Sequence, residues 1–223
     1  MLASPNADLE PLILPHSSSP SRDIAQRVEF CGGIGVGKST IARYLASQIG
    51  FQLIEESYDT VPFWSLHQQF SGFEFPKNIG FLIVHIEKIL STLDGEEVGK
   101  IVCDFSFTQI LAYADISGSV NEKRAFREIH QMLTARIGEP WLTVHLTCPV
   151  ETQIERIKRR ARIGETVPGS AFLKKLNGQI EIELSRLNGN VIAIQLERES
   201  SVEEISRKIQ KEIAKFQDFA APF

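Results

Sequence analysis

The segment GGIGVGKS, residues 32–39, limits the possible folds of this chain more than any other part of its sequence. It fits the pattern G-x-x-x-x-G-K-[ST] at every fixed position. The apolar run RVEFCG leads into it, and the helical spacing of STIARYLASQIG follows it. Together these features predict a strand, a glycine-rich turn and a helix, the unit from which parallel α/β sheets are built.

The glycines of this segment indicate a phosphate-binding loop. Glycine lets the backbone turn tightly and direct several N–H groups at one point, where the start of the next helix also favours an anion. Lys38 is expected to reach the β- and γ-phosphates of ATP, and the Ser39 hydroxyl to contact Mg²⁺. The alternative is a glycine-rich turn that binds no ligand. The residues expected to hold the nucleotide are Gly32, Gly33, Ile34, Gly35, Val36, Gly37, Lys38, Ser39 and Thr40.

Strand and helix patterns alternate after residue 25. Short apolar runs predict strands, and longer segments with apolar residues three or four apart predict helices. The expected strands are 27–32, 51–56, 100–104, 141–148 and 190–196. The expected helices are 39–50, 78–93, 106–115, 122–138, 150–162, 170–188 and 201–216. We therefore expect an α/β fold of the P-loop NTPase type, with a parallel five-stranded sheet and helices on both faces.

Composition sets outer limits on the organisation of the chain. Its 223 residues and 43% hydrophobic content suit a single domain over 26–223, after a disordered tail of prolines and serines over 1–25. The net charge of −4 argues against a partner such as polymeric nucleic acid. No apolar run approaches the roughly 20 residues that cross a membrane. Three cysteines without a C-x-x-C pair suit a reducing compartment, so we expect a cytoplasmic protein.

Two of the predicted strands end in carboxylates. Glu55 and Glu56 end the second strand, and Asp104 ends the third. The carboxyl ends of parallel strands face the ligand crevice, where phosphoryl transfer needs a base near the acceptor and an acid on the metal side. We favour the metal-side role for Asp104. The alternatives are a solvated glutamate pair and, at Asp104, a helix cap that Ser106 could also supply.

Arginines gather at the end of the helix predicted over 150–162. Arg156 and Arg160 are four residues apart and share a helix face, and Arg162 lies just beyond them. One guanidinium group can donate two hydrogen bonds to the oxygens of a phosphate, and it does not lose its charge. The alternative is a basic helix end that complements the helix dipole. Because the segment IGETVPG follows, we interpret these residues as an arginine-bearing lid over the phosphates.

With the lid arginines in place, residues 27–196 resemble the deoxynucleoside kinase family. The resemblance includes the phosphate loop, GFQLIEESYDTVPFW and IVCDFSFTQILAYA. The most specific segment is VHLTCPVETQIERIKRRARIGE, which resembles the strand, helix and lid of that family.

The resemblance implies roles for particular residues. Glu56 would be the general base on the 5′-hydroxyl of a nucleoside, and Asp104 would take the acidic position of the family's [D/E]-R-S segment. Arg156, Arg160 and Arg162 match the lid arginines. Glu165 matches an acid that contacts the sugar 3′-hydroxyl. Phe63, with Trp64 beside it, would form a stacking wall for the base, although both rings suit a core as well. A homodimer packed through NIGFLIVHIEKIL and EKRAFREIHQML is also implied.

The chain departs from the family pattern at its acceptor end. Phe105 stands where the family has Arg, and Ser57 replaces the usual Pro. The family's base-reading Gln falls near Leu82, so the neighbouring polar candidates are Asn78 and His85. A histidine on an apolar helix face is more often part of a core. The lid glycine is replaced by an alanine at 161.

Three functions remain open from the sequence. The first is ATP-dependent phosphorylation of a nucleoside 5′-hydroxyl. The second keeps the fold but takes a nucleoside monophosphate or another small metabolite, yet EESYDTVPFWSLHQQF contains no arginine for a phosphorylated acceptor. The third is a non-catalytic nucleotide-binding module, which Phe105 favours and the retained Glu56 and Asp104 disfavour.

Overall fold

The computed structural model describes residues 26–92, 99–161, 166–197 and 200–217. Its sheet has five strands in the order β2-β3-β1-β4-β5, and every neighbouring pair is parallel. The strands are β1 (Gln26–Cys31), β2 (Gln52–Ile54), β3 (Lys100–Cys103), β4 (Leu142–Thr147) and β5 (Val191–Gln195). The predicted parallel five-stranded sheet is therefore confirmed. The tail predicted over 1–25 lies outside the described residues.

Helices connect the strands, as predicted, with two differences. They are α1 (Lys38–Ile49), a 3-10 turn (Tyr58–Thr60), α2 (Trp64–Gln69), α3 (Glu74–Thr92), α4 (Phe107–Ser117), α5 (Val120–Thr134), α6 (Val150–Arg160), α7 (Ser170–Leu184) and α8 (Val202–Gln217). The short helix α2 was not predicted. Helix α3 begins four residues before the expected start, because Pro76 lies in its first turn, where a missing N–H costs no helical hydrogen bond.

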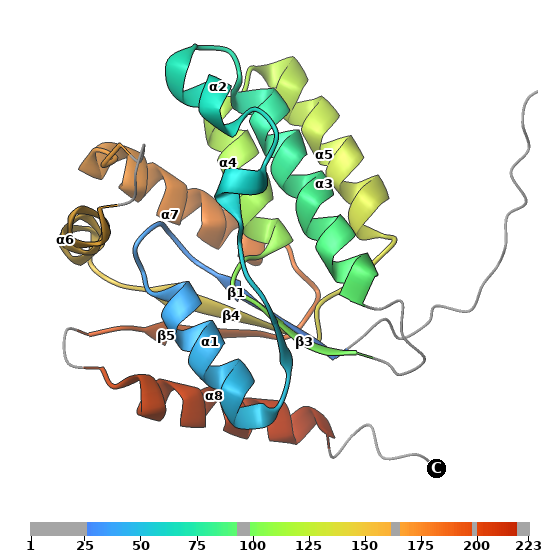
Figure 1. Cartoon of the computed structure of the whole chain (residues 1–223), viewed down its shortest axis with the longest axis vertical. Coiled ribbons are helices and arrows are strands. Elements are labelled where there is room, and N and C mark those ends of the chain that lie inside the picture. The colour runs from blue at the N-terminus through green and yellow to red at the C-terminus, as the bar shows by residue number, and fades with distance from the viewer. Residues whose placement is uncertain (1–25, 93–98, 162–165, 198–199, 218–223) are drawn as a thin grey trace, which may run out of the picture.

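The helices form a layer on each side of the sheet. Helices α1 and α8 cover one face, and α3, α4, α5 and α7 lie on the other (Figure 1). On the first side, β1 and β4 residues such as Phe30 and Val144 pack in one buried cluster with Leu45 of α1 and Ile209 of α8. On the second side, Ile101 of β3 shares a cluster with residues of α3 and α5. The expectation of helices on both faces is confirmed.

A buried ion pair joins the central strand to the second layer. Arg27 Nε donates to Glu29 Oε1 at 2.7 Å, and the Arg27 guanidinium also donates to the carbonyls of Ile137 and Gly138 at 2.8 and 2.6 Å. Glu29 in turn accepts the backbone N–H of Phe107 at 3.2 Å. Burial raises the pKa of Glu29, and Arg27 opposes that rise. The pair therefore fixes the start of α4 on β1, next to the phosphate loop.

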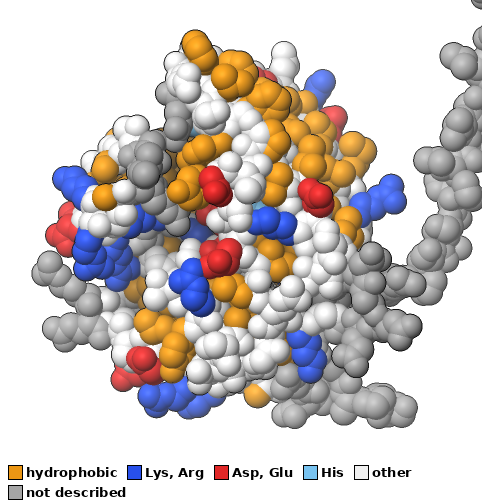
Figure 2. Space-filling model, in the orientation of Figure 1, with side chains coloured by type: hydrophobic (Ala, Val, Ile, Leu, Met, Phe, Trp, Pro, Cys, Tyr) orange, Lys and Arg blue, Asp and Glu red, His pale blue; other side chains and the backbone are white. Residues whose placement is uncertain are grey.

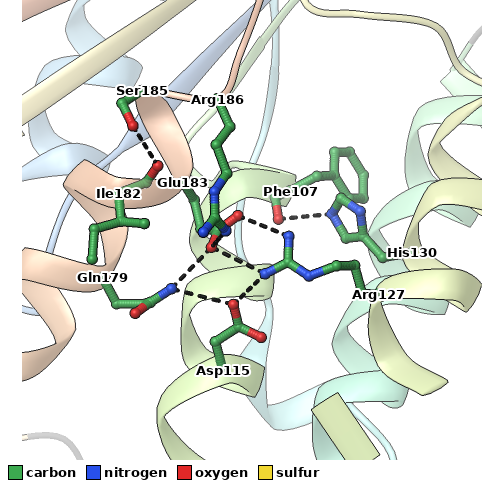
Figure 3. A network of polar contacts seen from close by, with 9 residues as sticks. All are labelled: Phe107, Asp115, Arg127, His130, Gln179, Ile182, Glu183, Ser185 and Arg186. Carbon is green, nitrogen blue, oxygen red and sulfur yellow. Dashed lines mark hydrogen bonds and ion pairs between the residues drawn. The ribbon is translucent and has the colours of Figure 1, made fainter. Parts of the chain in front are cut away.

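A polar network ties α4, α5 and α7 together (Figure 3). The guanidinium of Arg127 donates to both oxygens of Glu183, at 3.0 and 3.1 Å, and also pairs with Asp115. Gln179 bridges the two carboxylates at 3.2 and 2.9 Å, and Arg186 donates to Glu183 at 2.6 Å. Because the Glu183 side chain is only 2% exposed, its charge needs these donors. The network holds α7 against α4.

Candidate active site

The phosphate loop lies where the strand order of the sheet reverses. β1 has β3 on one side and β4 on the other, so the turn after β1 opens into the crevice at the carboxyl ends of the strands. Gly32 has a φ of 145°, and a Cβ there would lie 2.3 Å from the Leu146 carbonyl oxygen. Gly37, with a φ of 110°, is the N-cap of α1. Glycine is therefore required at both positions for the loop to take this shape.

Lys38 begins α1 and turns its ammonium back over the loop. Its Nζ donates to the carbonyl oxygens of Gly32 and Gly33 at 2.8 and 3.1 Å. Burial lowers the pKa of Lys38, while the negative charges of Glu56 and Asp104 oppose that shift. The lysine therefore places a buried positive charge between the loop and two carboxylates.

Glu56 and Asp104, two of the acidic residues predicted at strand ends, are neighbours in the structure. The β2–β3 register pairs Ile54 with Cys103, so the residues that follow the two strands leave the sheet at the same edge. The Glu56 backbone N–H donates to Asp104 Oδ1. The helix-cap alternative for Asp104 is not adopted, because Ser106 Oγ accepts the Gln109 N–H at 3.0 Å and caps α4. This hydrogen bond from Glu56 to Asp104 holds the backbone of Glu56 in place after the end of β2.

Neighbouring Glu55 and Glu56 face different surroundings. Glu56 lines the main cavity of the described residues, whereas Glu55 pairs with Arg43 at the surface. The Glu55 side chain is 48% exposed. Of the two glutamates, Glu56 is therefore the one placed at the cavity.

The main cavity has a volume of about 1200 Å³ and joins two parts of the molecule. Its first part is formed by the phosphate loop, α6 and the start of α8, and its second by helices α2, α3 and α4. The residues of the second part include Tyr58, Trp64, His67, Glu74, Lys77, Asn78, Phe81, Gln109, Ile110, Tyr113 and Ser117. A nucleotide on the loop and an acceptor between the helices would lie in one continuous space.

Arginines of α6 line the first part of the cavity. Arg156 Nη1 donates to the Val36 carbonyl of the phosphate loop at 2.7 Å. Arg160 lines the cavity, and its positive charge contributes to the lowered pKa of Lys38. Arg159 also lines it and was not predicted, although its spacing of three from Arg156 puts both on one helix face. Figure 2 shows Lys and Arg side chains gathered over α6. The predicted residues Arg162 and Glu165 lie outside the described residues.

Of the two aromatic residues expected to form the wall, only Trp64 lines the cavity. Phe63 is 44% exposed, lies beside Phe73 and is not among the residues that line the cavity. Trp64 does line it, with its ring centroid 5.2 Å from that of Tyr58 and 5.9 Å from that of Phe81. Phe63 has a φ of 66°, which turns the chain into α2 and directs the next ring inward.

Phe105 occupies the core rather than the cavity. It is fully buried and stacks on His85 of α3, with ring centroids 3.8 Å apart and an interplanar angle of 19°. His85 is also fully buried, and neither of its ring nitrogens has a hydrogen-bond partner in the described part of the chain. Of the two polar candidates on α3, only Asn78 lines the cavity. His85 is a core residue.

The residues present suit a magnesium ion held mainly by nucleotide phosphates. No group of three or more His, Cys, Asp or Glu side chains that could hold a metal occurs among the described residues. Ser39, in the first turn of α1, lines the cavity, and Asp104 is 3% exposed and acts on the pKa of Lys38 through its charge. Hydroxyl and carboxylate oxygens are the ligands that Mg²⁺ prefers, and it commonly takes only one or two of them from the protein.

Comparison with known proteins places these features in a family. Residues 28–218 match the deoxynucleoside kinase family. Deoxyguanosine kinase of Bacillus subtilis is 22% identical over 159 residues, which is 70% of this chain and 77% of that protein. Among solved structures, deoxyadenosine kinase from M. mycoides with dCMP and dCDP superimposes with a TM-score of 0.70 at 16% identity, covering 85% of this chain and 99% of the other. The same enzyme with dCTP gives a TM-score of 0.67 at 18% identity, covering 83% and 99%.

No helix in the described ranges is long and apolar enough to span a membrane.

Proposed function

This chain belongs to the deoxynucleoside kinase family, and from that premise we propose how its residues move a phosphoryl group from ATP to a nucleoside. The activity is that of a deoxynucleoside kinase-like phosphotransferase, which uses ATP to phosphorylate a nucleoside. The observation that carries the residue assignment is the continuous cavity. It joins the phosphate loop and α6 arginines to Glu56 and the space between α2, α3 and α4.

In the proposed reaction Glu56 acts as the general base. It accepts the proton of the nucleoside 5′-hydroxyl, whose oxygen forms a bond to the γ-phosphorus while the bond to the bridging oxygen of ADP breaks. Asp104 positions Glu56, because its carboxylate accepts the Glu56 backbone N–H. This bond fixes the backbone of Glu56, and the residue lines the cavity next to the acceptor space.

Cations stabilise the charge that develops on the moving phosphoryl group. Lys38 and the backbone N–H groups of residues 32–40 would hold the β- and γ-phosphates, and Arg156, Arg159 and Arg160 approach the same space from α6. Arg162 and Glu165 are assigned to the lid and the sugar on sequence resemblance alone. Ser39 and Asp104 would hold Mg²⁺, which neutralises phosphate charge when bound.

The acceptor is proposed to be a nucleoside rather than a nucleoside monophosphate. The similar proteins are kinases of deoxyguanosine and deoxyadenosine, which favours a purine deoxynucleoside here. The walls of the acceptor space include the aromatic rings of Tyr58, Trp64, Phe81 and Tyr113, on which a base could stack.

The proposal extends to the assembly and setting of the enzyme. Residues 26–223 would act as one kinase domain, and two copies would pair through α3 and α5. Ile83 and Leu90 of α3 support the pairing, since they are 52% and 44% exposed. A cytoplasmic location is supported by Cys31, Cys103 and Cys148, which are buried free thiols.

The test is ADP release from ATP and Mg²⁺ in the presence of deoxynucleosides, ribonucleosides and their monophosphates, each assayed separately. We expect release to depend on at least one deoxynucleoside. Lys38→Ala should abolish it, because the lysine is the buried cation of the phosphate loop. Release with monophosphates alone, or with none of the acceptors, would refute the proposed function.

A further inference from the structure

A buried lysine faces the acceptor space without a matching anion. Lys77 is 8% exposed, lines the cavity and belongs to the first turn of α3. Its ammonium makes no hydrogen bond or ion pair with the part of the chain that the structure describes, and Nζ lies 5.9 Å from the centroid of the Tyr113 ring. A buried ammonium without acceptors is costly unless a ligand supplies them.

The charges around Lys77 do not satisfy it. Glu74, on the same helix, uses one carboxylate oxygen to accept the Gly72 N–H and lies 3.9 Å from His67 Nδ1 through the other. Burial lowers the pKa of Lys77 to about 8, and Glu74 only partly opposes that shift. The groups that face it from other elements are His67 of α2 and Tyr113 of α4. Lys77 therefore remains mainly protonated at pH 7 and available to a ligand.

Two buried amides line the same cavity: Asn78 follows Lys77 on α3, and Gln109 lies one helical turn before Tyr113 on α4. Asn78 and Gln109 are 3% and 4% exposed, and both line the cavity. Gln109 Oε1 has no donor within the described residues, and Asn78 Nδ2 makes only a long contact of 3.4 Å with Ser117 Oγ. The wall between α3 and α4 thus offers an unused cation and an unused amide oxygen.

We propose that Lys77 and Gln109 select an acceptor nucleoside with a 6-oxopurine base, such as guanine or hypoxanthine. The inference rests on the proposed nucleoside kinase function and names its substrate class. The ammonium of Lys77 would donate to O6 and N7, and Gln109 Oε1 would accept the N1–H. The aromatic rings of the cavity would stack on the base.

The donor and acceptor pattern of the bases favours this class. An ammonium only donates, so it needs acceptors, and guanine presents O6 and N7 as adjacent acceptors. In adenine the group beside N7 is an amino group, which is itself a hydrogen-bond donor and cannot accept a hydrogen bond from the ammonium. Thymine has one carbonyl on the corresponding edge and no second acceptor like N7. Of guanine, adenine and thymine, only guanine offers two adjacent acceptors to the ammonium on this edge and an N1–H to the amide oxygen, which favours a 6-oxopurine.

The experiment compares kcat/KM for deoxyguanosine, deoxyinosine, deoxyadenosine, thymidine and dGMP in the wild type and three variants. Lys77→Met removes the charge at similar volume, and Gln109→Leu removes the amide. Lys208→Met, at an exposed position of α8, is the matched control. Fluorescent ATP binding to each variant confirms that the nucleotide site is intact.

We expect the wild type to prefer deoxyguanosine and deoxyinosine. Lys77→Met should lower kcat/KM for both by about 10- to 100-fold while changing that for deoxyadenosine less than about threefold, since a good base contact discriminates by about 1–3 kcal/mol. Gln109→Leu should act in the same direction, and Lys208→Met should not differ from the wild type.

The outcomes separate the inference from the proposed function. Preference for deoxyadenosine or thymidine, or an equal loss for all nucleosides in Lys77→Met, would overturn the 6-oxopurine assignment and leave nucleoside kinase activity standing. Turnover with dGMP alone would assign Lys77 to a phosphate and overturn both. Absence of turnover with every acceptor, despite ATP binding, would refute the proposed function itself.

Discussion

Glu55 and Glu56 are adjacent in the sequence, but the structure gives their carboxylates opposite environments. Glu55 is paired with Arg43 at the surface, and Glu56 lines the cavity with its backbone held by Asp104. The motif alone could not decide between them. The end of β2 determines which of the two glutamates faces the cavity, because successive side chains there point to opposite sides as the chain leaves the sheet.

We predict that Glu56→Gln lowers kcat by about 100-fold or more, because the amide cannot accept the 5′-hydroxyl proton. ATP affinity should stay within about threefold of the wild type, since the phosphate loop is unchanged. Steady-state kinetics and ATP titration measure the two effects. Glu55→Gln is the matched control and should retain activity. If the loss follows Glu55→Gln instead, the base is misassigned.

His85 is a residue-scale source of acid sensitivity. Burial lowers its folded-state pKa to about 3, and Lys88 adds to the shift. The unfolded chain has a histidine pKa of about 6.5, so between these two values the unfolded state binds a proton that the folded state does not. The stabilising contribution is therefore present above about pH 6.5 and is lost as the pH falls toward 3.

We predict that His85→Leu flattens the acid side of the stability profile. The free energy of unfolding of the wild type should fall faster than that of the variant between pH 6.5 and 4.5, with a difference of at most about 1.4 kcal/mol per pH unit. Urea unfolding at several pH values measures both slopes. Parallel slopes for the two proteins would show that His85 is not the responsible group.

At the scale of the element, α6 ends in a conformation that its sequence does not favour. Ala161, the C-cap of α6, has a φ of 43° and a ψ of 50°, and its N–H donates to the Ile157 carbonyl at 3.3 Å. This is the left-handed region, where glycine is the usual helix terminator. The glycine that the family has at this position is therefore explained by backbone geometry, and its replacement here stores strain beside the arginines.

We predict that Ala161→Gly stabilises the protein by about 1 kcal/mol, because Gly adopts the left-handed conformation without a Cβ clash. Thermal and urea unfolding measure the change. Ala171→Gly, at an exposed position within the first turn of α7, is the control and should destabilise by about 0.5 kcal/mol, as glycine does in a helix. A loss of stability in Ala161→Gly would contradict the assignment of strain.

At the scale of the whole molecule, local signals predicted the sheet and the phosphate loop, and tertiary contacts decided the rest. The strand periods and the glycine pattern are short-range, so β1, α1 and Lys38 follow from sequence. The acceptor wall depends instead on how residues 55–73 lie against α3. Gly80 permits this approach, since a Cβ there would lie 2.9 Å from the Pro62 carbonyl oxygen.

That approach explains what the sequence pattern left out. It places Trp64 at the cavity instead of Phe63, and it turns the α3 face with Lys77 and Asn78 toward the cavity. The spacing of Glu74, Lys77, Asn78 and Phe81 marks one helix face, but only the structure shows that this face is buried against a cavity and not against the sheet. Phe105 likewise lies in the core, where its ring stacks on that of His85.

The proposed homodimer gives the last prediction, because it concerns surface that one chain leaves uncovered. Ile83 and Leu90 are seven residues apart and share the outer face of α3, and hydrophobic side chains gather over α3 and α5 in Figure 2.

The double variant Ile83→Lys with Leu90→Lys should halve the mass measured by sedimentation at micromolar concentration. Unfolding stability should change little, because both side chains are largely exposed. Ile182→Lys on α7, where the side chain is 47% exposed, should keep the dimer. A wild-type protein that sediments as a single chain at every concentration, or a dimer lost only in Ile182→Lys, would place the interface elsewhere or exclude it.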